Sequence, residues 1–101
     1  MKIVLITGAN KGIGYEVAKQ LAAAGYTVLL GARSRSLGEE AATKLKQEGG
    51  DVRYIAIDLA DPGSIAAAAK QIDSEFGHLD LLINNAGIAV QGDGLPSSAS
   101  L

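Results

Sequence analysis

Residues 7–19, TGANKGIGYEVAK, contain two adjoining patterns of residues that could do chemistry. Residues 7–14 hold glycines in the spacing G-x3-G-x-G, which permits a tight turn and a close approach of the backbone to a phosphate. Tyr15 and Lys19 stand four residues apart, a spacing that brings two side chains to one face of a helix. The first pattern indicates phosphate binding, and the second raises the question of catalysis in the same segment.

The glycine-rich segment connects an expected strand to an expected helix. Short apolar runs alternate along the chain with longer stretches whose apolar residues recur at helical spacing. The apolar runs predict strands over residues 3–6, 26–30, 52–57 and 79–83. The longer stretches predict helices that start at Gly12, near Leu37 and at the Asp61–Pro62 pair.

Strands that are apolar on both faces and alternate with helices favour a parallel sheet covered on both sides. Right-handed crossovers between such strands give the order 3-2-1-4. We therefore predict an α/β fold, an incomplete Rossmann-type doubly wound parallel sheet with four strands and three helices. Residues 1–90 would form this nucleotide-binding half. Residues 91–101, rich in glycine, serine and proline, are expected to be a loop that leads to a C-terminal half beyond Leu101.

The composition describes one small globular domain and argues against several classes of function. The chain has 101 residues, 48% of them hydrophobic, and a formal net charge of −2, which argues against nucleic acid or an anionic membrane as the main partner. It has no cysteine and one histidine, so neither thiol chemistry nor a metal site is expected. The first apolar run is too short for a signal peptide or a membrane span, which favours a soluble, cytoplasmic protein.

Residues 7–14 (TGANKGIG), Asp58 at the end of the expected third strand, and residues 84–87 (NNAG) after the fourth form an ordered set of motifs. This set resembles the TGxxxGxG turn, the adenine-contacting aspartate and the NNAG motif of the short-chain dehydrogenase/reductase family. The resemblance covers residues 1 to about 90. A phosphate loop of the G-x-x-x-x-G-K-[ST] type is excluded, because Lys11 precedes Gly12 and no Lys-Ser or Lys-Thr follows.

The resemblance implies a role for each matched position. The glycine turn would line a pyrophosphate, Asp58 and the Leu59 backbone would contact adenine, and residues 85–87 would lie under the adenosine ribose. Asn84 would mainly tie neighbouring strands together. Taken alone, Asp58 could be an ordinary turn aspartate and NNAG an ordinary turn. The predicted cofactor-binding residues are Gly8, Asn10, Lys11, Gly12, Ile13, Gly14, Arg33, Asp58, Leu59, Asn85, Ala86 and Gly87.

The residues after the second strand indicate which cofactor is preferred. A carboxylate there would accept a hydrogen bond from the ribose 2′-OH of NAD and would repel a 2′-phosphate. This sequence has Ala32 and then Arg33, while Lys11 brings a second cation from the glycine turn. Basic residues at both positions resemble the NADP-preferring pattern of the family, and the turn resembles that of carbonyl reductases. We predict NADP(H), although Arg33 and Arg35 could also simply be solvated loop residues.

Tyr15 and Lys19 match the family's catalytic Tyr-x-x-x-Lys pair in spacing but not in position. In the family this pair lies beside the nicotinamide on a helix after the fifth strand, and the tyrosine gives or takes the proton. Here the pair lies on the first helix, whose start would hold the pyrophosphate. We therefore interpret the match as coincidental and predict no catalytic residue in this chain. His78 and Asp80, before the fourth strand, are interpreted as structural.

The resemblance implies the NADP(H)-binding portion of an oxidoreductase that transfers hydride between NADPH and a carbonyl or alcohol. The small-molecule substrate would bind only with the C-terminal half, and the sequence does not indicate which substrate it is. Two alternatives stay open: a nucleotide-binding or regulatory module without catalysis, and a fragment that completes the sheet of another chain. The expected fourth strand would be an apolar open edge, which predicts self-association.

Overall fold

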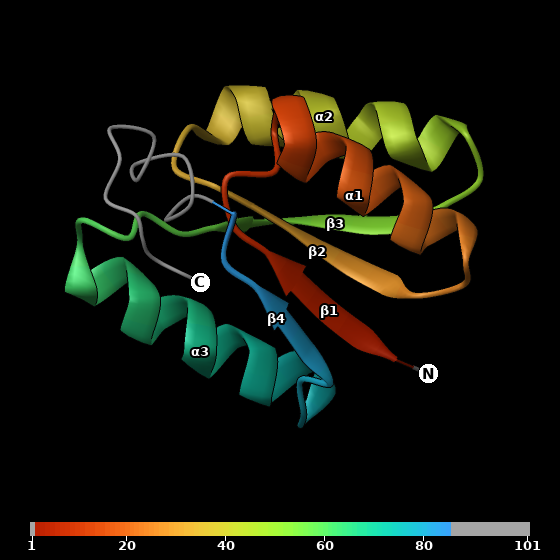
Figure 1. Cartoon of the computed structure of the whole chain (residues 1–101). Coiled ribbons are helices and arrows are strands. Elements are labelled where there is room, and N and C mark those ends of the chain that lie inside the picture. The colour runs from red at the N-terminus through yellow and green to blue at the C-terminus, as the bar shows by residue number, and fades with distance from the viewer. Residues whose placement is uncertain (1, 86–101) are drawn as a thin grey trace, which may run out of the picture.

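The computed structural model describes residues 2–85, in which strands and helices alternate. The elements are β1 (Ile3–Ile6), α1 (Gly12–Ala23), β2 (Thr27–Ala32), α2 (Arg35–Gln47), β3 (Asp51–Ala56), α3 (Pro62–Phe76) and β4 (Leu81–Ile83). All neighbouring strands pair in parallel, in the order β3-β2-β1-β4 (Figure 1). The predicted Rossmann-type topology is therefore confirmed for this part of the chain. The loop predicted over residues 91–101 lies outside the described residues.

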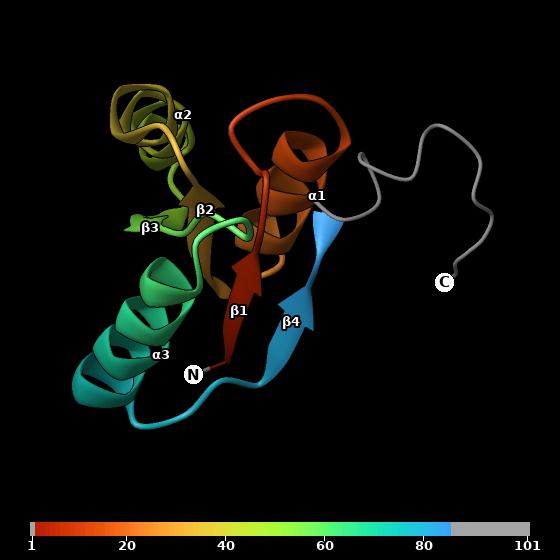
Figure 2. The same ribbon diagram turned by 90° about the vertical axis from the view of Figure 1, so that its left-hand side faces the viewer.

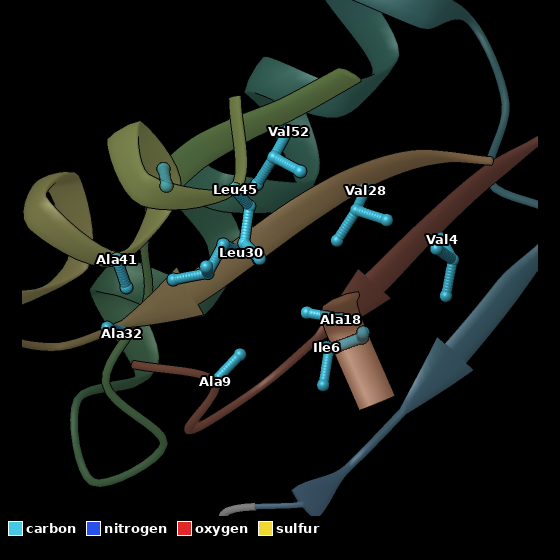
Figure 3. Close-up of a cluster of buried hydrophobic side chains, with 11 residues drawn as sticks. Val4, Ile6, Ala9, Ala18, Val28, Leu30, Ala32, Ala41, Leu45 and Val52 are labelled. Atoms are coloured by element: carbon cyan, nitrogen blue, oxygen red, sulfur yellow. The ribbon is translucent and has the colours of Figure 1, made fainter. Parts of the chain in front are cut away.

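The helices cover the two faces of the sheet unequally, with α1 and α2 on one face and α3 on the other (Figures 1 and 2). Successive residues of a strand point to opposite faces, so each strand supplies both layers. Val4, Val28 and Val52 pack toward α1 and α2, together with Ala18 and Leu45 from those helices (Figure 3). The α3 face has its own cluster, formed by Ile3, Leu5, Leu29, Ile55, Ile57, Ala68 and Ile72. Burial on both faces explains why β1 and β2 are continuous apolar runs.

β4 differs from the inner strands in length and in burial. Residues 79–83 were predicted to form this strand, but it begins at Leu81. The reason is a contact with β1, far away in the sequence: the Ile3 N–H donates to the Asp80 carboxylate at 2.7 Å, where a regular ladder would use a backbone carbonyl. Leu81 and Leu82 remain 41% and 57% exposed. The bounds of β2 and β3 also differ slightly from the predicted 26–30 and 52–57, since these strands pair from Thr27↔Asp51 through Ala32↔Ala56.

The start of α3 follows the predicted capping pattern. The Gly63 N–H donates to Oδ1 of Asp61 at 3.0 Å, and Pro62 occupies the first helical position, which needs no N–H partner. Gly77 ends the helix with a left-handed φ of 77°, which glycine adopts at little cost. None of the helices in residues 2–85 is long and apolar enough to cross a membrane.

Candidate functional site

The predicted site segments meet at one edge of the sheet. The glycine turn follows β1, Arg33 follows β2, Asp58 follows β3, and Asn85 follows β4. Because all four strands are parallel, these segments lie at the same carboxyl-terminal edge (Figure 1). The chain runs from β1 to β2 on one side, whereas β4 lies on the other side of β1. This reversal of strand order next to β1 is where open α/β sheets bind their ligands.

The glycine turn needs its glycines for two different reasons. Gly8 and Gly12 have φ of 61° and 65°, the left-handed conformation that other residues adopt only with strain. No atom lies within 4 Å of where a Cβ on Gly12 would be, so the requirement there is conformational. A Cβ on Gly14 would lie 2.6 Å from Nδ2 of Asn85 and 2.7 Å from the Gly8 carbonyl oxygen. Gly14 therefore lets α1 begin in close contact with the turn.

The start of α1 lacks a side-chain cap, unlike the starts of the other two helices. Ser34 caps α2 and Asp61 caps α3, but Lys11, at the corresponding position of α1, makes no such bond. Within residues 2–85, the N–H groups of Gly12 and Ile13 have no acceptor, and Ile13 is 74% exposed. Exposed N–H groups and the positive end of the helix dipole together favour an anion at this position.

The two asparagines after β4 fasten the glycine turn to the end of that strand. The Thr7 hydroxyl donates to Oδ1 of Asn84 at 2.9 Å, so Asn84 ties β1 to β4 as predicted. Nδ2 of Asn85 donates to the Gly8 carbonyl oxygen at 3.1 Å. This hydrogen bond was not predicted, because no local pattern joins two residues that lie 77 positions apart. Ala86 and Gly87, also predicted site residues, lie outside the described part of the chain.

Asp58 lies in a loop that the start of α3 holds in place. Its Oδ1 accepts a hydrogen bond from the Ala60 N–H at 3.0 Å, and no residue of the described range donates to its second oxygen. The Ser64 hydroxyl accepts from the Asp58 N–H at 2.8 Å and lies 2.9 Å from the Asp58 carbonyl oxygen. Ser64 was not predicted, although its place in the first turn of a helix that Asp61 caps was a usable signal. Leu59, next in the chain, is 40% exposed.

Lys11 and Arg33, the two basic residues predicted to contact the 2′-phosphate, are exposed and lack ion-pair partners in residues 2–85. Lys11 lines a hollow of about 190 Å³ between the start of α1 and the side of α2, and Asn10 and Glu40 also line it. Arg33 directly follows the buried Ala32 at the end of β2. The nearby Arg35 is instead engaged, because its guanidinium lies 3.3 Å from the Glu39 carboxylate. Lys11 and Arg33 are thus available to an anionic ligand.

Tyr15 and Lys19 contact different partners. Tyr15 packs against the core on the α1/α2 face of the sheet. The Lys19 ammonium lies 4.0 Å from the carboxylate of Glu48, just beyond the end of α2. Tyr15 is thus a packing residue of α1, and Lys19 is a surface residue that forms an ion pair.

His78 and Asp80 lie at the opposite, amino-terminal edge of the sheet. One oxygen of Asp80 accepts from the Ile3 N–H at 2.7 Å and lies 3.0 Å from Nε2 of His78. The hydrogen bond from Ile3, followed by the interactions with His78, lowers the pKa of Asp80 below its ordinary value. This pair joins the segment before β4 to the first residue of β1, which is a structural role.

Comparison with known proteins agrees with this architecture. Residues 2–99 match the family model described as short chain dehydrogenase. (+)-Neomenthol dehydrogenase of Capsicum annuum is 42% identical over 99 residues, which cover 91% of this chain and 32% of that relative. The chain therefore spans about a third of the length of this curated relative.

Solved structures show the same similarity. Menthone neomenthol reductase from Mentha piperita aligns with a TM-score of 0.79 and 35% identity, over 99% of this chain and 42% of that one. L-sorbose reductase from Gluconobacter frateurii, complexed with NADPH and L-sorbose, aligns with a TM-score of 0.75 and 36% identity, over 80% of this chain and 31% of that one. Together with the fold and the geometry of the glycine turn, the match to the family model over residues 2–99 shows that the chain belongs to the short-chain dehydrogenase family.

Proposed function

We propose that this chain is the NADP(H)-binding portion of an oxidoreductase that transfers hydride between NADPH and a carbonyl or alcohol substrate. The observation that supports this most strongly is the uncapped, exposed start of α1 behind a glycine turn that Asn85 fastens to β4. When bound, the reduced nicotinamide would supply the hydride.

The glycine turn fits a pyrophosphate in shape and in electrostatics. Gly8 and Gly12 carry no side chain that would keep a phosphate from the backbone, and Gly14 lets α1 begin close to the turn. The N–H groups at the start of α1 would donate to the phosphate oxygens. Ile13 would cover the same ligand with its exposed side chain. No acidic residue lies in the first turn of α1, so no carboxylate would repel the anion there.

The loop after β3 and the segment after β4 fit the adenosine part. The second oxygen of Asp58 would accept a hydrogen bond from the adenine amino group, with Leu59 alongside. Asn85, and with it Ala86 and Gly87 from the family motif, would lie under the ribose. Because Ser64 holds the backbone of Asp58, the carboxylate is oriented before any ligand arrives.

The residues around the end of β2 favour NADP over NAD. Arg33 and Lys11, assisted by Asn10, would donate to the 2′-phosphate, and Ala32 offers no carboxylate to repel it. Each charge-assisted hydrogen bond to a phosphate would contribute about 1.5–3 kcal/mol. The NADPH bound to L-sorbose reductase is consistent with this preference in a relative.

Calorimetric titration of the chain with NADPH and with NADH tests the proposal. We expect NADPH to bind more tightly, and Arg33→Ala to lower the ratio of the two affinities by about tenfold or more. Arg53→Ala is a matched control, because Arg53 is another exposed arginine but pairs with Asp51 on the edge strand β3. Equal affinity of the wild-type chain for both cofactors would contradict the NADP assignment, and no binding of either would contradict the function itself.

We also propose a second function, association with another copy of this chain through the β4 side of the sheet. In residues 2–85, β4 pairs with β1 alone, and an apolar hollow of about 380 Å³ lies between β4 and α3. Ile65, Ile72, Leu79 and Leu82 are among the residues that line it. An exposed apolar strand edge of this kind is unusual for a monomer.

Sedimentation velocity over a concentration series tests this association. Leu82→Ser should shift the chain toward monomer, whereas Leu37→Ser, which changes a similarly exposed leucine on the opposite face, should leave the distribution unchanged. A wild-type chain that stays monomeric across the series would exclude this association.

A further inference from the structure

The carbonyl group at the end of β2 is held by two hydrogen bonds from β3 and the loop after it. The Tyr54 hydroxyl donates to the Ala32 carbonyl oxygen at 3.0 Å, and the Ile57 N–H donates to the same oxygen at 3.2 Å. Ordinary strand pairing accounts for only the second of these bonds. The Tyr54 bond is an additional side-chain contact to the last residue of the strand.

The position of the Ala32 carbonyl group determines where the backbone nitrogen and Cα of Arg33 lie. The Ala32–Arg33 peptide is planar, so the carbonyl oxygen, the Arg33 nitrogen and the Arg33 Cα are fixed as one unit. Two donors on that oxygen therefore restrict the direction in which the Arg33 side chain leaves the sheet. Arg33 is exposed and has no ion pair in the described range, so its backbone sets the point from which its side chain reaches a ligand.

A glycine in α2 makes room for the tyrosine. Gly38 is buried within α2, where glycine costs about 0.5–1 kcal/mol relative to alanine, so its presence needs a reason. A Cβ on Gly38 would overlap the Tyr54 ring and would lie 3.2 Å from Cβ of Ala32. The ring therefore reaches Ala32 only because residue 38 has no side chain.

The hydroxyl is available as a donor at any pH at which such an enzyme works. Partial burial raises the pKa of Tyr54 above its ordinary value, a change that the nearby Arg35 opposes and Glu39 supports. The Arg35 guanidinium is itself paired with Glu39.

We propose that Tyr54 is a positioning residue for cofactor selectivity: its hydroxyl fixes the Ala32–Arg33 peptide so that Arg33 meets the 2′-phosphate of NADP(H), and Gly38 provides the space for its ring. This inference rests on the proposed function, because it assigns Arg33 to that phosphate. Tyr54 does not touch the ligand in this account, and it acts through Arg33.

The test compares Tyr54→Phe with Tyr26→Phe in the full chain by titration with NADPH and with NADH. Tyr26 is also half-buried and packs on the same core, but its hydroxyl makes no hydrogen bond within residues 2–85. Tyr54→Phe should raise the Kd for NADPH about fivefold, the effect of losing one hydrogen bond, and leave the Kd for NADH within about twofold. Tyr26→Phe should change neither.

A double-mutant cycle with Arg33→Ala separates positioning from general stability. In the Arg33→Ala background, Tyr54→Phe should no longer change the ratio of NADPH to NADH affinity. The inference is overturned if both cofactors weaken equally, if Tyr54→Phe has no effect, or if its effect on the ratio persists without Arg33. Failure of the NADP assignment has a different signature, since Arg33→Ala alone would then leave the ratio unchanged. Failure of the proposed function itself would appear as no binding of either cofactor to the wild-type chain.

A measurement on the chain without cofactor distinguishes the proposed positioning effect from a folding defect. In the ¹H–¹⁵N spectrum of the free chain, Tyr54→Phe should shift the amide signal of Arg33 while the signals of β1 stay in place. Gly38→Ala should shift the same signal, because the added methyl group displaces the Tyr54 ring and moves its hydroxyl away from Ala32, although the hydroxyl itself is kept. An unmoved Arg33 signal in both variants would overturn the inference, and so would shifts spread over the whole sheet.

Discussion

Replacing Gly14 by alanine tests the geometry on which the candidate site depends. The added Cβ would lie 2.7 Å from the Gly8 carbonyl oxygen and 2.6 Å from Nδ2 of Asn85, against 3.4–4 Å for an ordinary contact. The Asn85 side chain can move, but the Gly8 carbonyl belongs to the backbone of the turn. The turn must therefore retreat from α1 by several tenths of an ångström.

The expected free-energy change combines two opposing effects. Overpacking at a close contact costs about 1–3 kcal/mol, while alanine in place of glycine in a helix stabilises it by about 0.5–1 kcal/mol. We expect Gly14→Ala to lower the free energy of unfolding by about 1–2 kcal/mol. Since the Gly8 turn would also be displaced from the ligand, the affinity for NADPH should fall by about tenfold or more.

Urea denaturation and NADPH titration measure the two effects, with Gly63→Ala as the control. Gly63 lies in the first turn of α3, and its Cβ would meet only the Asp61 side chain, at 3.3 Å. Gly63→Ala should be neutral or slightly stabilising and should not change NADPH binding. If Gly14→Ala is tolerated as well as Gly63→Ala in both assays, the close contact between α1 and the turn does not serve the site.

Three other changes test separate parts of the account. Arg33→Asp should weaken NADPH more than NADH in calorimetry, because it replaces a phosphate partner with a repelling carboxylate; equal weakening would remove Arg33 from the 2′-phosphate site. Asp80→Asn should destabilise the chain at neutral pH but not in acid, because folding lowers the pKa of Asp80. Such a group stabilises the fold above its unfolded-state pKa and loses that effect as the pH falls through its folded-state pKa. Urea midpoints at about pH 7 and about pH 3 measure this, and a difference from wild type that stays constant with pH would contradict it. Tyr15→Phe should leave any NADPH-dependent carbonyl reduction by the protein unchanged within about twofold, whereas loss of that activity would show that Tyr15 is catalytic.

The topology could be predicted from the sequence because each part of the prediction depends on local pattern and chain connectivity. Continuous apolar runs identify buried parallel strands, and the handedness of the crossovers then leaves one strand order. The Asp61 cap was predictable for the same reason, because its donor lies two residues further along the chain. The start of β4 was predicted incorrectly, since it depends on the contact of Asp80 with Ile3 at the far end of the sequence.

The contacts that orient the site residues could not be predicted from the sequence. Asn85 meets Gly8 across 77 positions, and Tyr54 meets Ala32 across 22, and neither pair has a spacing that reveals it. The sequence does not show why a glycine stands at position 38 inside a helix, because the reason is the Tyr54 ring that lies beside it. Motifs thus indicated which residues gather at the site, while three-dimensional packing decides how they are held.

Amide mapping by NMR with NADPH as the ligand tests the central claim most directly. The account predicts that a ¹H–¹⁵N titration moves the signals of residues 8–14 together with those of Arg33 and Asp58, at the carboxyl-terminal edge of the sheet. The signals of His78 and Asp80, at the opposite edge, should stay in place. Shifts confined to that opposite edge, or an unchanged spectrum at saturating NADPH, would contradict a dinucleotide site at the start of α1.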